Sequence, residues 1–274
     1  MTPEFAYRSD IFSSLPDNSG YLGIYISENR CDIAVCSSAF VLCLFHTYTK
    51  PSELDQSTFL RQIFAENQSL FATHFQEVNI SVQGNQFVLL PTKLNIDADE
   101  ALGILTNVDD CETFHHATPI HDCRITFAVT SSIIAVINNS FENPRILHPA
   151  AFIIDQSLTA QQADGVLVFD EEHFDLVVKK EGTIHSVNRH QFETAEDVSY
   201  FTLLALKDAN LEPRNTNLIV SGKIARHEDV HMNLLKFINT VEVKSLQTSV
   251  SMRSDFDQSP HLAEQVLNVL HANY

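Results

Sequence analysis

Short apolar segments alternate with polar turns in the first part of the chain, and this pattern predicts strands. Three such segments, Leu22–Ile26, Asp32–Cys36 and Val41–Tyr48, follow one another with only brief polar breaks. Their β-branched content and close spacing are typical of antiparallel strands joined by tight turns. The sequence therefore predicts a meander of three strands after a polar lead-in of twenty residues.

Helix and strand patterns alternate after this meander. Apolar residues recur at helical spacing from Phe59 to Phe71, behind a capping residue at Asp55 or Ser57. The elements predicted after that helix are strands at 78–82, 87–90, 125–129 and 145–148, and helices near 97–105, from 130 to 137 and after 154.

The same order of elements restarts in the second half of the chain. Gly165–Phe169, Phe174–Lys179 and Thr183–Val187 form a second predicted meander. Thr194 begins a helix, and Asp197 three residues later is its capping-box partner. The remaining predicted elements are a strand at 217–220, a helix around 230–238, a strand at 241–243 and a helix at 262–270.

The two meanders align without gaps at an offset of 143 residues, from Leu22 to Phe45. Of seven corresponding positions, three are identical: Glu28 with Glu171, Asp32 with Asp175, and Val35 with Val178. Apolar alternation alone produces part of such a match, so the matched order of elements is the stronger sign of a repeat. We therefore predict an internal duplication, with residues 1–160 as the first lobe and 161–274 as the second.

The start of the predicted helix in the second lobe carries a more specific pattern. Residues 188–201 read Asn-Arg-His-Gln-Phe-Glu-Thr-Ala-Glu-Asp-Val-Ser-Tyr-Phe, and an apolar strand later ends at Ser221-Gly222. This pattern resembles the bacterial domain-of-unknown-function 3822 family. The resemblance implies an α/β, two-lobed actin-like ATPase fold of the duplicated ribonuclease H-like type, in which each lobe is a mixed sheet (three-stranded antiparallel meander plus parallel strands) with flanking helices. It implies no assigned function.

Composition narrows the classes of partner and the compartment. The chain has 17 basic and 35 acidic residues, a formal net charge of −18, which repels nucleic-acid phosphates and anionic membranes. No apolar run reaches the ~18 residues of a membrane helix, and the N-terminus lacks a signal-peptide pattern. An odd number of cysteines, five, is typical of reduced thiols. We therefore expect a cytoplasmic protein that neither inserts into membranes nor binds nucleic acid.

Glycine is scarce, with seven in 274 residues, and this bears on nucleotide binding. In active actin-like ATPases, the resemblance implies, two meander turns hold phosphate and metal, and a glycine pair after a late strand approaches the adenosine. The corresponding turns here, Ser27–Arg30 and Asp170–His173, contain no glycine. Side chains there would keep backbone amides away from phosphate oxygens. The candidate cleft residues are Glu28, Asp170, Glu171, Gly222 and Lys223.

These observations favour a non-catalytic interaction or scaffold protein with a degenerate cleft, an unidentified protein partner and no cofactor. The alternative is a Mg²⁺-dependent nucleotide-binding protein or weak ATPase. In that reading Glu28, Asp170 and Glu171 hold the metal and Lys223 meets a phosphate, because only a bound cation makes carboxylates compatible with a polyphosphate. Lys223 could equally cap a helix or pair with the acidic turn.

Two other groups of residues could carry function. Two cysteines and three histidines lie between Cys111 and Cys123, but their spacing matches no standard zinc site, and we predict no metal centre there. The aromatic residues Phe174, Phe192, Tyr200 and Phe201 could form a surface for a partner. Helical spacing favours the core for Phe201.

Overall fold

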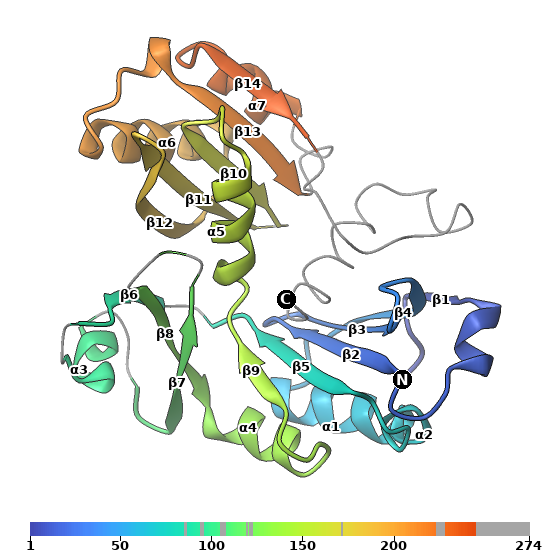
Figure 1. Ribbon diagram of the computed structural model, residues 1–274. Coiled ribbons are helices and arrows are strands. Elements are labelled where there is room, and N and C mark those ends of the chain that lie inside the picture. Colours follow the sequence, from blue (N-terminus) through green and yellow to red (C-terminus); the bar gives the residue numbers. More distant parts are fainter. Residues whose placement is uncertain are drawn as a thin grey trace. The chain divides into compact units, whose positions relative to one another are not determined.

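The computed structural model describes residues 1–84, 87–93, 96–104, 108–118, 120, 123–170, 172–222 and 228–244. The chain divides into two compact units, which Figure 1 shows with their helices and strands. Unit 1 comprises Met1–Ala117 and Asp122–Pro149, and unit 2 comprises Ala150–Gln247, in the described parts of those ranges.

Unit 1 contains a six-stranded mixed sheet in the order β1-β4-β3-β2-β5-β9. β2, β3 and β4 form the predicted antiparallel meander, and β5 and β9 continue the sheet in parallel. The strands are β1 (Phe5–Arg8), β2 (Gly20–Ile26), β3 (Arg30–Ser37), β4 (Leu42–Thr49), β5 (Glu77–Val82) and β9 (Arg145–Leu147).

The N-terminal segment is not the polar lead-in that the sequence predicts. Its residues form β1, which pairs antiparallel with the outer edge of β4, and the 3-10 helix η1 (Asp10–Ser14). Phe5 and Tyr7 pack on a buried cluster that includes Tyr25 and Phe45, whereas Ala6 and Arg8 between them are exposed. The alternation of these four residues was the strand signal, but four residues are too few for it to stand out.

Helices of unit 1 pack beside the large sheet. The bounds are α1 (Gln56–Glu66), α2 (Gln68–Phe71), α3 (Ala98–Gly103) and α4 (Ser131–Asn138), and α1 packs on α4. Asp55 caps α1 by accepting a hydrogen bond from the Thr58 amide at 2.9 Å, as predicted. The single helix predicted over 59–71 is divided at Asn67, whose buried side chain donates to the Tyr48 hydroxyl at 2.9 Å.

A second, three-stranded antiparallel sheet in unit 1 has the order β6-β8-β7. Its strands are β6 (Phe87–Pro91), β7 (Cys111–Ala117) and β8 (Cys123–Thr130). The sequence predicts a loop where β7 lies, and that expectation is wrong. β7 is an edge strand of polar residues, none of them buried, so it lacks the apolar alternation on which the prediction depends.

Unit 2 contains a five-stranded mixed sheet in the order β12-β11-β10-β13-β14. Its strands are β10 (Gly165–Phe169), β11 (His173–Lys180), β12 (Thr183–Gln191), β13 (Asn217–Gly222) and β14 (Thr240–Val243). Its helices are α5 (Ala150–Thr159), α6 (Ala195–Asp208) and α7 (Glu228–Leu234), with the 3-10 turn η2 (Pro213–Asn215). The Thr194–Asp197 capping box begins α6 as predicted.

The two meanders share their register. Ile24 lies opposite Ile33, and Leu167 lies opposite Leu176, so the offset of 143 residues also relates the strand pairing. Each second strand is bulged where it meets the third, between Val35 and Cys36 in β3 and between Val178 and Lys179 in β11. The bulges therefore fall at the same position of the two meanders.

Different side chains occupy the bulged position in the two units. Lys179 is 4 % exposed, and its ammonium group donates to the Ser157 carbonyl at 2.8 Å and to the Ala160 carbonyl, at the end of α5. Burial lowers the pKa of Lys179. Its counterpart Cys36 is buried, and burial raises the pKa of that thiol.

All five cysteines have free thiols and belong to unit 1. Among the described residues, no helix is both long enough and apolar enough to cross a bilayer. The helix predicted at 262–270 lies outside the described residues.

Candidate functional site

The β2–β3 turn of unit 1 holds the candidate residue Glu28. The Ser27 amide donates to the Arg30 carbonyl at 2.9 Å, which closes the turn, and Gln56 at the start of α1 donates to the Ser27 carbonyl at 2.8 Å. Glu28 is exposed at the tip. The turn is therefore fixed to the sheet and to α1, and it presents one solvated carboxylate.

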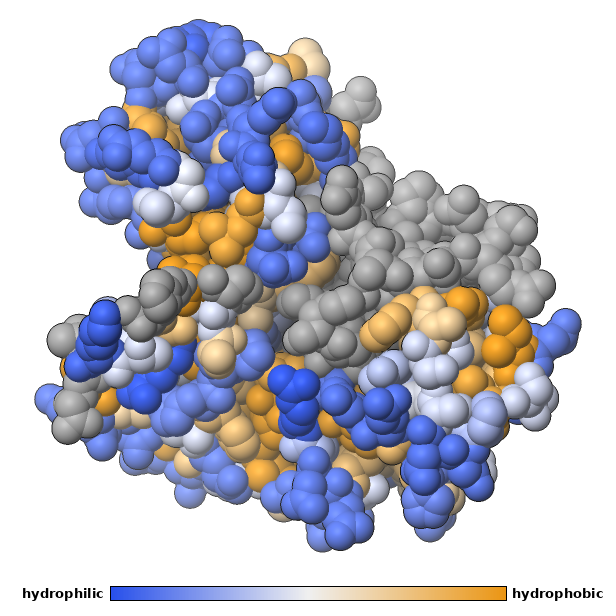
Figure 2. Space-filling view, in the orientation of Figure 1, coloured by the Kyte–Doolittle hydropathy of each residue, from blue (hydrophilic) through white to orange (hydrophobic). Residues whose placement is uncertain are grey.

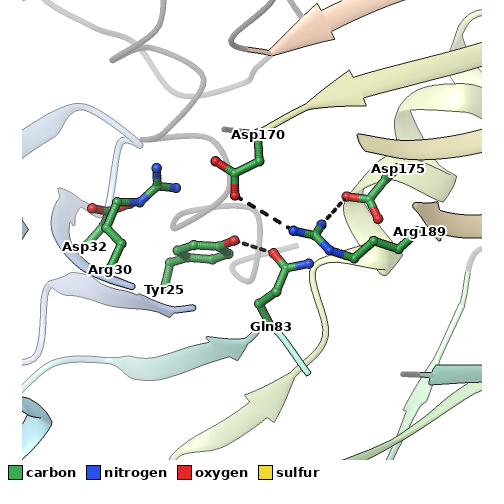
Figure 3. Close-up of polar contacts among 7 residues, drawn as sticks. All are labelled: Tyr25, Arg30, Asp32, Gln83, Asp170, Asp175 and Arg189. Atoms are coloured by element: carbon green, nitrogen blue, oxygen red, sulfur yellow. Dashed lines mark hydrogen bonds and ion pairs between the residues drawn. The ribbon is translucent and has the colours of Figure 1, made fainter. Parts of the chain in front are cut away.

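A buried ion pair lies directly below this turn. Asp32 is fully buried on β3, and the Arg30 guanidinium approaches its carboxylate at 2.9 Å (Figure 3). The same guanidinium lies 5.2 Å from the Tyr25 ring centre, where a cation is attracted to the aromatic face. The Tyr25 hydroxyl in turn donates to Gln83. Arg30 thus compensates the buried charge of Asp32 within unit 1.

Unit 2 has a corresponding cluster at the β10–β11 turn. Arg189 on β12 lies 2.7 Å from the Asp175 carboxylate and 3.9 Å from that of Asp170, and Figure 3 shows both carboxylates directed toward the guanidinium. Burial raises the pKa of Asp175, although the Arg189 charge acts in the opposite direction. The Asp170 amide donates to the His173 carbonyl at 2.8 Å and closes the hairpin. One arginine therefore bridges two acidic residues.

The two aspartates occupy the same position of their meanders but take their arginines from different strands. Asp32 lies opposite Thr47 and pairs with Arg30 on its own strand. Asp175 lies directly opposite its partner, Arg189. Each meander therefore encloses one buried aspartate together with its own cation.

Gly222 ends β13 with a left-handed backbone, φ +86°. A Cβ at this position would lie 2.2 Å from the Phe169 carbonyl oxygen and 2.6 Å from the Phe169 nitrogen. Glycine is therefore required here for the close approach of β13 to the end of β10. This packing role is sufficient to explain the residue.

Of the five candidate cleft residues, Glu171 and Lys223 lie outside the described residues. Glu28 belongs to unit 1, and Asp170 and Gly222 belong to unit 2. Within unit 2, Asp170 follows β10 and Gly222 pairs with Phe169, so these two candidates lie at the same end of adjacent strands.

The segment from Cys111 to Cys123 does not gather its ligand-type side chains. Cys111 is paired with Thr130 and Cys123 with Pro91, so the two thiols lie at opposite ends of the β7–β8 ladder. Six residues of strand separate such positions by about 20 Å. Within the part of the chain that the structure describes, no cluster of three or more metal-ligating side chains is found.

The arginines are the site residues that sequence reasoning missed. A signal was present, because a charged residue in the middle of an apolar strand needs a partner, and Asp32 and Asp175 share one position. The identity of the partners depends on strand pairing. Arg189 is fourteen residues from Asp175 in sequence, and only the β11–β12 register brings the two together.

Comparison with solved structures defines the class of this protein. It is similar to a Bacteroides thetaiotaomicron protein with actin-like ATPase fold and unknown function, with a TM-score of 0.75 and 16 % identity over 87 % of this chain and 94 % of that one. It is also similar to a protein of the PilM-PilN type IV pilus biogenesis complex, with a TM-score of 0.55 and 11 % identity over 93 % of this chain and 98 % of that one. The chain has the actin-like ATPase fold, as expected.

The family follows from the sequence match. The model of the family described as "Protein of unknown function (DUF3822)" matches residues 10–241, and the chain belongs to that family. The resemblance drawn from residues 188–201 is thereby confirmed. No curated protein matches the chain.

Proposed function

We propose that this protein is a cytoplasmic, non-catalytic interaction or scaffold protein whose nucleotide site has degenerated. One observation carries the proposal: Arg189 lies at ion-pair distance from both Asp170 and Asp175 in unit 2. A guanidinium held between two carboxylates supplies the positive charge that Mg²⁺ would otherwise bring, and a second cation would be repelled. The acidic β10–β11 turn is therefore neutralised from within.

The first meander supports the same conclusion. Its buried aspartate, Asp32, is paired with Arg30, and Glu28 is the exposed carboxylate of the β2–β3 turn. Mg²⁺ with a nucleotide is usually bound through one or two carboxylates together with the substrate phosphates. A turn without glycine offers those phosphates no close backbone approach. The proposal accordingly includes no resident ATP or Mg²⁺.

A protein partner is the remaining role that the fold suggests. The structure similar to this chain at a TM-score of 0.55 is, by its title, part of a complex of PilM with PilN. That likeness concerns the fold, and it provides a precedent for a chain of this shape that works by holding another protein. A strongly acidic surface, with a formal net charge of −18, favours a basic partner.

The shared register and bulges support an internal duplication. A bulge is an irregularity that two unrelated meanders would have no reason to place at the same position. Val35 and Val178, which precede the bulges, are also related by the offset of 143 residues. We propose that the lobes, residues 1–160 and 161–274, descend from one ancestral unit.

Thermal unfolding with and without millimolar Mg-ATP tests the proposal against the alternative. A ligand at 100 times its dissociation constant stabilises the folded state by about 2.7 kcal/mol, which raises the melting temperature by several degrees. We expect no change in melting temperature. A rise that Lys223→Ala abolishes and that the control Lys207→Ala retains would show instead that the protein binds nucleotide.

A further inference from the structure

The outer edge of β12 in unit 2 is open among the described residues, because β12 is the last strand of its sheet. The Phe192 amide donates to the Glu172 carbonyl at 3.0 Å, and bonding pairs alternate along an antiparallel ladder. Val187 and Gln191 therefore direct their backbone N–H and C=O groups away from β11. Groups of this kind are the template on which an additional strand forms.

The corresponding edge of unit 1 is covered by the chain itself. β1 pairs with Leu44–Thr47 of β4, and the Glu4 amide donates to the Thr47 carbonyl at 2.8 Å. Thr47 lies opposite Asp32 as Arg189 lies opposite Asp175, so Ser186–Arg189 of β12 is the counterpart of that stretch. Strand addition at this position of the sheet is thus already present once in this protein.

Helix α6 runs alongside the open edge and leaves apolar side chains exposed there. The Phe201 ring stacks on His190 of β12 at 4.3 Å. One face of α6 continues from Phe201 through Leu204 to Asp208, which lies 3.2 Å from His185 of β12. Leu204 is 50 % exposed, and Tyr200, packed edge-on against Phe201, is 62 % exposed. We call these two side chains with the outer edge of β12 the β12 ledge.

Acidic side chains surround the β12 ledge. Glu193 and Glu196 are exposed at the start of α6, Asp208 is exposed at its end, and Glu181 is exposed in the turn before β12. Figure 2 shows small hydrophobic areas on unit 2 among mostly hydrophilic side chains. A second copy of the chain, with its formal net charge of −18, is repelled by such a surface, whereas a basic segment is attracted.

We propose that an extended segment of a partner protein, apolar at alternate positions and basic at the positions between, adds to β12 as a further strand. Its apolar side chains pack on Tyr200 and Leu204, and its backbone bonds to the outward groups of Val187 and Gln191. This proposal rests on the proposed function, because it specifies the partner and the surface for an interaction protein.

A synthetic peptide of alternating lysine and apolar residues, Lys-Val-Lys-Phe-Lys-Val-Lys, tests the proposal by fluorescence anisotropy with the full chain. Two further peptides carry N-methyl groups on the lysines or on the apolar residues. In an added strand only one of these two sets faces β12, so we expect one methylated peptide to bind like the parent and the other to lose binding. Equal binding of both methylated peptides would overturn strand addition.

Matched variants locate the binding surface. Leu204→Asp is expected to weaken the parent peptide at least tenfold, whereas Met232→Asp, at an equally exposed apolar residue of α7, leaves the affinity unchanged. The β12 ledge is excluded if Leu204→Asp binds like the wild type, if no saturable binding occurs below millimolar peptide, or if the chain instead dimerises through this edge. Each of these outcomes leaves the Mg-ATP result untouched, so failure of this inference is distinguishable from failure of the proposed function.

Discussion

Single residues in this protein bring charge into the interior of the sheets and compensate it there. Asp32, Asp175 and Lys179 are all buried, and each has a partner of its own unit. A buried ion pair adds little net stability, because desolvation offsets the attraction, but removing one member leaves an uncompensated charge. These residues therefore matter most when their partners are changed.

Arg189→Met is expected to lower the free energy of unfolding by about 3–5 kcal/mol, because Asp175 loses its cation in a buried site. The double variant Arg189→Met with Asp175→Leu is expected to recover most of that loss, since no unpaired buried charge remains. Urea denaturation monitored by circular dichroism measures both. A double variant that is less stable than the single one would contradict the account.

Asp175 also predicts a pH dependence. Burial raises the pKa of the folded carboxyl above 3.8, the model value that the unfolded chain retains. The stability that Asp175 contributes is therefore fully present below the unfolded pKa and is lost as pH rises through the folded pKa. The difference in unfolding free energy between the wild type and Asp175→Asn should accordingly decrease as pH rises above about 4. A difference that grows over this range would show that Arg189 dominates over burial.

At the scale of the element, the end of β13 depends on a glycine for two separable reasons. Gly222 has φ +86° and also lies against the Phe169 backbone, whereas Gly182 in the β11–β12 turn has φ +77° and nothing near its Cβ position. Gly182→Ala is therefore expected to cost about 1–2 kcal/mol for backbone strain alone. Gly222→Ala should cost clearly more, because β13 must also move away from β10. Equal losses in thermal or urea unfolding would contradict a close-approach requirement.

The start of α6 makes a second prediction at this scale. The Thr194 side chain accepts from the Asp197 amide, and the Asp197 carboxylate accepts from Glu193 and Thr194 amides, which lowers the pKa of Asp197. Thr194→Ala is expected to cost about 1 kcal/mol of unfolding free energy. Because the folded pKa is lowered, the contribution of Asp197 is present above the unfolded pKa and is lost as pH falls through the folded value. Asp197→Asn should remove that acid sensitivity, as measured by urea unfolding between pH 2 and 5.

The elements that sequence reasoning predicted correctly are those whose signal is local. Buried strands such as Gly165–Phe169 are continuous apolar runs bounded by turns, and the α6 start carries its capping box in four residues. The elements it missed are β1 and β7, short or polar edge strands that become strands only because a neighbouring strand presents hydrogen-bonding groups. Edge strands are therefore decided by tertiary pairing more than by their own sequence.

The candidate site could be predicted only in part. The loss of glycine from the two turns is visible in the sequence, and so is the repeated aspartate at Asp32 and Asp175. The arginines are not, since one lies two residues before its partner and the other lies across a strand pair. A repeat in sequence therefore revealed the common requirement for a cation, while the structure was needed to identify each cation.

At the scale of the whole molecule, the chain is built from two units with separate cores. Unit 2 has its own buried cluster around Phe174, Leu176 and Val220, and unit 1 has buried clusters of its own sheet. Chains composed of several compact units often unfold in more than one step. The stability of the protein is then a property of each unit.

We therefore expect two transitions in differential scanning calorimetry. Arg189→Met should lower the temperature of one transition, and Arg30→Met should lower the other, because each arginine compensates an aspartate of its own unit. A single transition that moves equally with either variant would instead indicate that the two units unfold as one.

The distribution of thiols has a practical consequence. Cys31, Cys36 and Cys43 are buried in the large sheet of unit 1, and unit 2 contains no cysteine in its described or undescribed sequence. Burial raises the pKa of each of these three thiols, so the reactive thiolate forms only when the sheet opens. An alkylating reagent applied to the native protein, after Cys111 and Cys123 have been replaced by serine, would thus act as a clock for the opening of one unit and remain silent about the other.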